Sequence, residues 1–170
     1  DTMTRYCTAY GLGQKTGVEL PEATGILAGP AYRDNYGLAE WNDIDTLMFA
    51  IGQSDNLFTP LSICQYTAAI TNGGTRYAAH LLSRVVEFGT GEVIYEKAPE
   101  VLSSFTLSDS SVRAVKEGMR QVIYRGTSAS LSSYFSDLPA SVIVGGKTGT
   151  AQVRATESDN GVFTCVAPLD

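Results

Sequence analysis

Two stretches of the chain show the spacing of apolar residues that is typical of helices. The first begins at Thr59-Pro60, where a hydroxyl can cap the helix and proline fits its first position. Asn72-Gly-Gly74 ends it, because these residues tolerate the left-handed backbone conformation. The residues in between are apolar on several sides, which predicts a buried helix: Leu61, Ile63, Cys64, Ala68 and Ile70.

The second helix is predicted between Ser108 and Gly126, and it is the clearest in the chain. Ser108 is a suitable N-cap, and Asp109 places a negative charge at the positive end of the helix dipole. Apolar residues then recur at helical spacing, at Val112, Val115, Met119, Val122 and Ile123.

Four short runs with strand character form two pairs. Leu81–Phe88 and Glu92–Glu96 flank Gly89-Thr-Gly91, which predicts a hairpin. Val142–Val144 and Val162–Val166 predict a second antiparallel pair, with polar residues and glycine between them. Because helices and strands do not alternate in βαβ order, the pattern favours the α+β class, with an antiparallel sheet flanked by helices.

The rest of the chain carries weaker signals. The first 40 residues are rich in glycine and predict turns and short extended pieces, one of them at Val18–Pro21. Leu131–Leu138 predicts a serine-rich connection, anchored by Tyr134 and Phe135.

Length and charge exclude several classes of protein. The chain has 170 residues, which fits one domain, and its net charge of −6 argues against a nucleic-acid partner. Its apolar stretches are too short to span a bilayer, so we expect no membrane contact from this segment. Cys7, Cys64 and Cys165 are widely spaced, and His80 is the only histidine, so neither a metal site nor another cofactor is predicted.

The segment that carries chemistry is Gly145–Gln152, at the end of an apolar strand. It combines Lys147, the hydroxyls of Thr148 and Thr150, and glycines that let a ligand approach the backbone. Such a set would bind a carboxylate lying along a strand edge. A phosphate-binding loop is excluded, because Ser141 stands where its first glycine is required.

Lys-Thr-Gly is also one of three elements of serine acyl-transfer enzymes, together with S-x-x-K and S-x-N. A second copy occurs at Lys15-Thr-Gly17. The preceding strand, the glycine pair and the following Thr-Ala-Gln favour Lys147 as the functional copy. We expect Lys15 to be a solvated lysine in a turn.

An ordered series of motifs resembles the transpeptidase domain of class B penicillin-binding proteins, the enzymes that cross-link peptidoglycan. The resemblance covers nearly the whole chain, and it rests on Tyr10-Gly-Leu-Gly-Gln-Lys-Thr-Gly-Val-Glu-Leu-Pro21, Ile51-Gly-Gln53, Thr59-Pro-Leu61, Thr71-Asn-Gly-Gly74, Gly91-Glu-Val-Ile-Tyr95, Gly126-Thr127 and Gly146-Lys-Thr-Gly-Thr-Ala-Gln152. It implies acyl transfer from the D-Ala-D-Ala end of a stem peptide, acylation by β-lactams, and a parent anchored at the extracytoplasmic face of the bacterial membrane.

The resemblance also implies roles for residues of the strand. Lys147, Thr148 and Thr150 would hold the terminal carboxylate of the donor or of the β-lactam. The backbone N–H of Thr150 would form one arm of the oxyanion hole. Gly146 and Gly149 would keep the strand edge open.

The nucleophile of the family is missing. Positions 12, 94, 113 and 144, three before each lysine, are not serine, so no S-x-x-K exists. We therefore expect residues 1–170 to be a fragment of a single transpeptidase domain that starts downstream of S-x-N and ends in the strand after Lys-Thr-Gly. We expect it to be inactive alone. Removal of sheet neighbours would favour self-association through exposed strand edges.

Other candidates and alternatives are weaker. Ser54-Asp-Asn56 and Ser158-Asp-Asn160 match S-x-N, but their order along the chain differs from the family, so loops are favoured. His80, Glu92 and Glu96 are expected to be solvated, while Trp41, Tyr32 and Tyr36 either pack or line a groove, with packing favoured. A catalytically dead homologue acting as a scaffold remains an alternative, and a serine β-lactamase relative is a weaker one.

Overall fold

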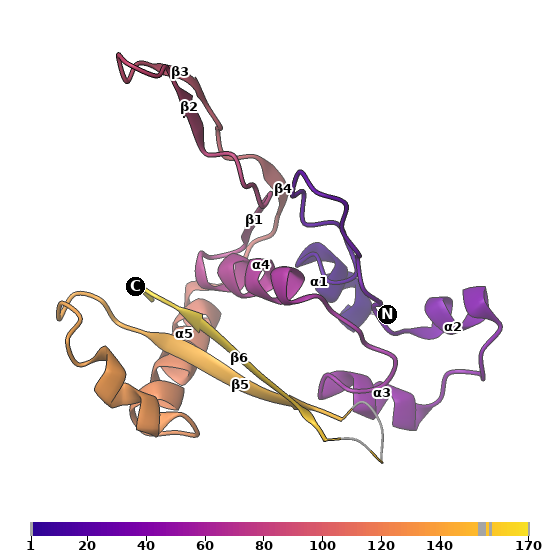
Figure 1. The fold of residues 1–170 in the computed structure, drawn as a ribbon. Helices are drawn as coiled ribbons and strands as arrows, with labels where there is room; N and C mark the ends of the chain where they lie inside the picture. The colour runs from indigo at the N-terminus through magenta and orange to yellow at the C-terminus, as the bar shows by residue number, and fades with distance from the viewer. Residues whose placement is uncertain (1, 153–155, 157, 170) are drawn as a thin grey trace.

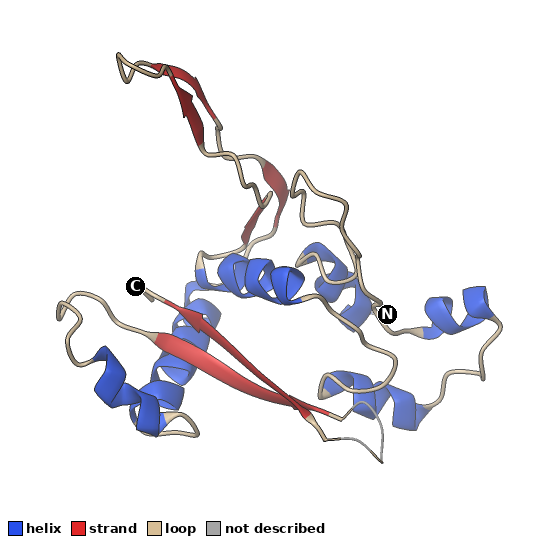
Figure 2. Cartoon of the chain, in the orientation of Figure 1, coloured by secondary structure: helices blue, strands red, loops and turns tan. Residues whose placement is uncertain are grey.

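The structure is a computed structural model that describes residues 2–152, 156 and 158–169. The helices of these residues are α1 (Thr2–Ala9), α2 (Pro30–Tyr36), α3 (Asp43–Ala50), α4 (Pro60–Thr71), α5 (Asp109–Tyr124) and the 3₁₀ helix η1 (Ala129–Phe135). The strands are β1 (Thr75–Tyr77), β2 (Arg84–Val86), β3 (Val93–Glu96), β4 (Val101–Ser104), β5 (Gly145–Ala151) and β6 (Asn160–Val166). They pair as β1–β4, β2–β3 and β5–β6, each antiparallel (Figures 1 and 2). The predicted α+β class, with antiparallel sheets flanked by helices, is confirmed.

Helix α4 occupies the centre of the molecule, between the β1–β4 pair and the β5–β6 pair (Figure 1). As predicted, Thr59 caps it, and its hydroxyl accepts a hydrogen bond from the Ser62 N–H at 3.2 Å. Several of its buried side chains are polar. The Gln65 amide donates to the carbonyls of Thr16 at 2.8 Å and Tyr77 at 2.6 Å. These bonds attach the first glycine-rich segment and β1 to α4.

Arg76 of β1 is the most unusual buried group, with only 4% of its surface exposed. Its Nε donates to Gln65 Oε1 at 2.8 Å, its Nη1 to Gln14 Oε1 at 3.0 Å, and its Nη2 to the carbonyl of Lys15. Desolvation lowers the pKa of Arg76, and the charge of Glu22 opposes part of that effect. The guanidinium thus joins the first glycine-rich segment to the core through neutral acceptors.

Helix α5 forms as predicted and packs against β5. The Ser108 hydroxyl accepts from the Ser111 N–H at 3.2 Å, and Met119 and Ile123 form the buried stripe. A Cβ atom on Gly146 would lie 2.9 Å from Ile123 and 2.8 Å from the Phe163 ring. Glycine therefore permits the close approach of β5 to this helix.

An antiparallel β5–β6 pair forms, and β6 includes the predicted strand Val162–Val166, but β5 contains none of the predicted strand Val142–Val144. Val142–Val144 precede the strand, because β6 ends at Val166, which pairs with Gly145. Val144 is nevertheless buried, with 2% of its surface exposed. The β-branched Val144 therefore contributes to the packing of the core and does not belong to a strand.

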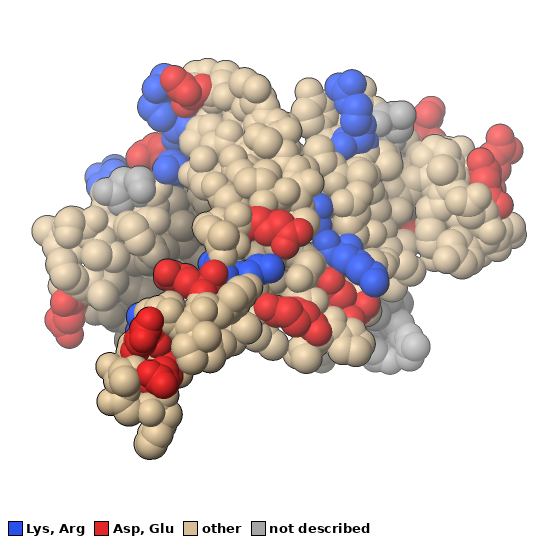
Figure 3. Space-filling model, turned by 90° about the horizontal axis from the view of Figure 1, so that it is seen from above, with Lys and Arg blue, Asp and Glu red and all other residues tan. Residues whose placement is uncertain are grey.

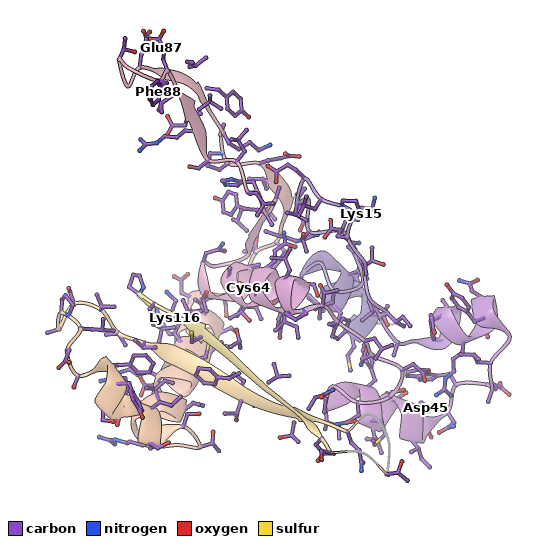
Figure 4. All side chains as sticks on the ribbon, in the orientation of Figure 1. Lys15, Asp45, Cys64, Glu87, Phe88 and Lys116 are labelled. Atoms are coloured by element: carbon purple, nitrogen blue, oxygen red, sulfur yellow. The ribbon has the colours of Figure 1, made fainter. Side chains whose placement is uncertain are left out.

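The predicted hairpin around Gly89–Gly91 is also confirmed. Val85 pairs with Tyr95, and the β2–β3 pair projects from the body of the molecule (Figure 1). Glu87 and Phe88 lie at its tip, where the Phe88 side chain is fully exposed (Figure 4).

The structure corrects three further predictions. The first 40 residues contain two helices, α1 and α2, and α2 starts at Pro30 and ends before Gly37, whose φ is 62°. Val18–Pro21 is irregular, because no strand of the described chain pairs with it. Tyr134 is 79% exposed, so it does not anchor the serine-rich connection, which forms η1 instead.

Candidate ligand site along strand β5

Lys147 lies on β5, and its side chain is exposed. Side chains alternate between the faces of a strand, so Lys147 shares a face with its cross-strand partner Thr164. The Thr164 hydroxyl donates to Thr67 of α4 at 3.2 Å, which identifies this as the face towards α4. Thr148 and Thr150 point to the opposite face. A ligand that contacts all three side chains must therefore lie along the edge of the strand.

One edge of β5 pairs with β6, and among the described residues the other edge pairs with no strand. The Gln53 side chain approaches from that second side and donates from Nε2 to the Thr150 carbonyl at 3.4 Å. In an antiparallel strand the N–H and C=O of one residue point to the same side. The N–H of Thr150 is therefore directed to the unpaired edge as well.

A groove of about 1310 Å³ lies against β5 and β6 on the side that faces α4, because Asn160, Val162 and Thr164 of β6 line it as well. Lys147–Gln152 form its polar border, and apolar residues of α3, α4 and α5 form much of its wall, among them Phe49, Ile63 and Met119. A second groove, of about 840 Å³, lies between α4, α5 and the end of β6 and contains Cys64, Lys116 and Cys165. Lys147 thus lines a groove, as a carboxylate-binding residue requires.

Two contacts hold the polar side chains of the strand. The Thr148 hydroxyl lies 3.2 Å from the hydroxyl of Thr127, which follows α5. The Lys147 ammonium donates to the carbonyl of Thr148. The Lys147 cation and the Thr148 hydroxyl are therefore both held close to the backbone of Thr148.

The glycines of the segment occupy different surroundings. Gly146 is buried against Phe163 and Ile123, so its space is filled by protein. Gly149 is exposed, and a Cβ atom added there would lie 3.8 Å from Val162, its nearest neighbour. The predicted role in keeping the edge open fits Gly149 better than Gly146.

The first Lys-Thr-Gly copy lies on the opposite side of α4 from β5 (Figure 4). The Lys15 side chain is exposed in an irregular segment, as expected. Thr16 is buried, and its N–H and hydroxyl both donate to the carboxylate of Glu22, at 2.9 Å and 2.6 Å. The polar groups of this copy therefore bind a carboxylate of the same chain, that of Glu22.

The first S-x-N match lies in a loop, and the second runs from a loop into the first residue of β6. Asn56 accepts from the Ala28 N–H at 3.0 Å and donates to the Gln53 carbonyl at 2.9 Å, while Asp55 pairs with Arg33 at 2.8 Å. Ser54 has a φ of 69° and a buried hydroxyl without a hydrogen-bond partner. Ser158 is exposed and irregular, and Asn160 starts β6.

The remaining candidates are the residues that were expected to be solvated and the aromatic residues that were expected to pack. His80, Glu92 and Glu96 are exposed. The Trp41 indole donates to Thr46 at 2.8 Å and contacts Phe49 and Arg33, which fits packing. The rings of Tyr32 and Tyr36 are tilted by 42° with their centroids 4.8 Å apart, but Tyr36 is 70% exposed and does not pack into the core.

The described residues contain no group of His, Cys, Asp and Glu that could hold a metal ion. The three cysteines are free, and burial raises the pKa of the Cys7 thiol. On the face seen in Figure 3, basic and acidic side chains are interspersed without a large basic field. Within the described chain, no helix is both long and apolar enough to cross a membrane.

Two contacts to the strand were not predicted from the sequence. Gln53 and Thr127 both belong to motifs noted above, Ile51-Gly-Gln53 and Gly126-Thr127. Their membership in these motifs was the available signal. Their roles depend on contacts across 97 and 21 residues of chain, which local patterns do not reveal.

Comparisons with known proteins identify the family to which this α+β domain belongs. The family described as penicillin binding protein transpeptidase domain matches residues 1–170, so the chain belongs to that family. The predicted resemblance to class B proteins is confirmed by its relatives. Penicillin-binding protein 2A of Bacillus subtilis (strain 168) is 35% identical, over 100% of this chain and 24% of that protein.

Other relatives agree. Peptidoglycan D,D-transpeptidase MrdA of Acinetobacter baumannii is 29% identical, over 100% of this chain and 26% of that protein. The crystal structure of Pseudomonas aeruginosa PBP2 in complex with WCK 5153 has a TM-score of 0.76 and 26% identity, over 98% of this chain and 36% of that one. The chain spans about a quarter of the length of these two curated relatives.

Proposed function

We propose that this chain is the penicillin-binding part of a peptidoglycan D,D-transpeptidase that cross-links stem peptides. The observation that carries the proposal is the placement of Lys147, Thr148 and Thr150 along an unpaired strand edge beside a groove. Lys147 and the two hydroxyls hold the terminal carboxylate of the donor or of a β-lactam. The Thr150 N–H donates to the oxyanion, a contact whose loss typically slows such reactions by about 10²–10³.

The attacking serine comes from a segment outside this sequence. Its oxygen forms an ester with the carbonyl carbon of the penultimate D-alanine, and the terminal D-alanine leaves with a protonated amine. An amine on the stem peptide of a neighbouring peptidoglycan strand then attacks the ester carbonyl. A new amide forms, and the serine recovers its proton.

The exposed surface supports the proposal that residues 1–170 are part of a larger domain. The chain has an accessible surface of 11335 Å², whereas a compact protein of 18.1 kDa has about 8,000 Å². Large apolar side chains such as Leu47, Ile51 and Leu57 are mostly exposed, and the last two line the groove. The same surface favours self-association of the isolated chain.

We place the parent at the extracytoplasmic face of the bacterial membrane, where its peptidoglycan substrate lies.

The test is covalent labelling of the full-length protein with a fluorescent penicillin, read on a denaturing gel. We expect Lys147→Ala to slow labelling at least about 10²-fold. The matched control is Lys15→Ala, which removes the lysine of the other copy and should change labelling less than about twofold.

Two results would contradict the proposal. Labelling of the isolated 170 residues would show that the chain carries its own nucleophile. A full-length protein that contains S-x-x-K, is folded and is not labelled would indicate a binding or scaffold module.

A further inference from the structure

Thr127 contacts the ligand-binding strand from outside it. Its hydroxyl lies 3.2 Å from the Thr148 hydroxyl, which makes the two threonines hydrogen-bond partners. Thr127 comes two residues after Arg125, the C-cap of α5, so its place depends on how that helix ends.

The turn that carries Thr127 is well held. The Arg125 N–H donates to the Gln121 carbonyl at 2.9 Å, and the Ser128 N–H donates to the Val122 carbonyl at 3.0 Å. Ser128 is buried. A Cβ on Gly126 would lie 2.9 Å from Val122, so this glycine allows the turn to close against the helix. The Thr127 hydroxyl is thus presented to β5 by a fixed backbone.

The direction of this hydrogen bond has a chemical consequence. A hydroxyl has one proton and can donate only once, although it can accept twice. If Thr148 donates to Thr127, it presents lone pairs to a ligand, which repel a carboxylate. If Thr127 donates to Thr148, the Thr148 proton is free for the ligand.

We propose that Thr127 is a positioning residue that donates to Thr148 and thereby orients the Thr148 proton towards the carboxylate of the ligand. This inference rests on the proposed function, because it needs a carboxylate at Thr148. The bound anion favours the arrangement in which Thr127 donates to Thr148 and Thr148 donates to the carboxylate, since a hydrogen bond to a charged acceptor is stronger than one to a neutral acceptor. Consecutive hydrogen bonds of one direction also polarise one another.

The experiment uses the full-length protein and two probes, a penicillin and the methyl ester of the same penicillin. The second-order rate of acylation is measured for wild type, Thr127→Val and Thr127→Ser. Valine keeps the shape of threonine and removes the donor, whereas serine keeps the donor. We expect Thr127→Val to slow acylation by the free carboxylate about 10-fold. Acylation by the ester should change less than about twofold, and Thr127→Ser should retain most of the wild-type rate.

A structural effect would give a different pattern. Misplacement of β5 by Thr127→Val would slow both probes equally, and that result, or unchanged rates for both, would overturn the inference. Thr148→Val provides a second check, because Thr127→Val should add no further loss in that background. An additive loss would also overturn the inference.

Failure of the proposed function can be recognised separately. A wild-type protein that neither probe acylates would overturn both proposals. A wild-type protein that is acylated, with a Thr127→Val variant that treats the two probes alike, would overturn only the role of Thr127.

Discussion

The two Lys-Thr-Gly copies share three residue types and an exposed lysine and glycine, but they differ in backbone conformation and in the burial of the threonine. At 15–17 the segment is irregular, Thr16 is buried with 1% exposure, and its polar groups bind the Glu22 carboxylate. At 147–149 the segment is a strand with exposed Lys147 and Gly149. The first copy already has an internal anion as its partner. The second directs its polar groups to a groove.

The comparison teaches that the tripeptide by itself specifies no function. The threonine and the backbone of the first copy bind the Glu22 carboxylate, and we propose that the second copy binds the carboxylate of a ligand. What differs is whether the chain supplies that carboxylate. We therefore expect substitutions in the first copy to change stability and substitutions in the second to change ligand binding.

The largest difference in stability between variants of the two copies is expected at the third residue, which is Gly17 in the first copy and Gly149 in the second. Gly17 has a φ of 88°, and a Cβ there would lie 2.9 Å from the Cβ of Ala78. Gly17→Ala combines left-handed strain with overpacking and should lower the free energy of unfolding by about 2–4 kcal/mol. Gly149→Ala should change it by less than about 0.5 kcal/mol, because no close atom surrounds that site. Urea unfolding of the complete transpeptidase domain measures both, and equal losses would remove the distinction.

A smaller contribution to the free energy of unfolding is expected from the Glu22 carboxylate, which binds the first copy. Hydrogen bonds from Thr16 and Gly17 lower the pKa of Glu22 in spite of its desolvation, which acts in the opposite direction and is the largest single influence. Because the folded pKa is lowered, this stabilisation is present above the pKa of an unfolded Glu, about 4.3, and is lost as the pH falls through the folded value.

Glu22→Gln tests this contribution. We expect the variant to lose about 1–2 kcal/mol near pH 7 and to show a shallower decrease in acid than wild type. Unfolding curves recorded between neutral and acid pH give the difference. Parallel pH profiles for the two proteins would exclude a role for the Glu22 charge.

The smallest effect is expected when each threonine loses its hydroxyl. Thr16→Val removes the bond of 2.6 Å to Glu22 and should cost about 1 kcal/mol. Thr148→Val, whose partner Thr127 is exposed, should cost less than about 0.5 kcal/mol. Thermal melting of the two variants provides the measurement. A larger loss for Thr148→Val would mean that this hydroxyl is structural.

Local signals predicted the elements whose ends carry caps or turns. Thr59 and Ser108 were correctly identified as helix caps, and Gly89–Gly91 as a hairpin turn. Helix α3 has an equally strong signal, a capping box of Asn42 and Asp45, which was overlooked. The β1–β4 pair joins short strands separated by a hairpin, so no local pattern revealed it.

The site was predictable to the extent that it lies on one strand. The β-branched run and the glycine pair identified the segment around Lys147, and the structure confirms its strand conformation. Gln53 and Thr127 reach it from distant loops, so their contacts follow only from tertiary packing. The positioning role of Thr127 is a proposal that the variants Thr127→Val and Thr127→Ser test.

The buried Arg76 makes the residues allowed at two positions of the chain depend on each other. A side chain at Gly11 would overlap the Arg76 guanidinium, and a shorter residue at 76 would leave Gln14, Gln65 and the Lys15 carbonyl without their donor. Neither position can be exchanged freely while the other is kept. Anyone who recombines segments of related proteins should therefore transfer the Gly11 and Arg76 regions as one block.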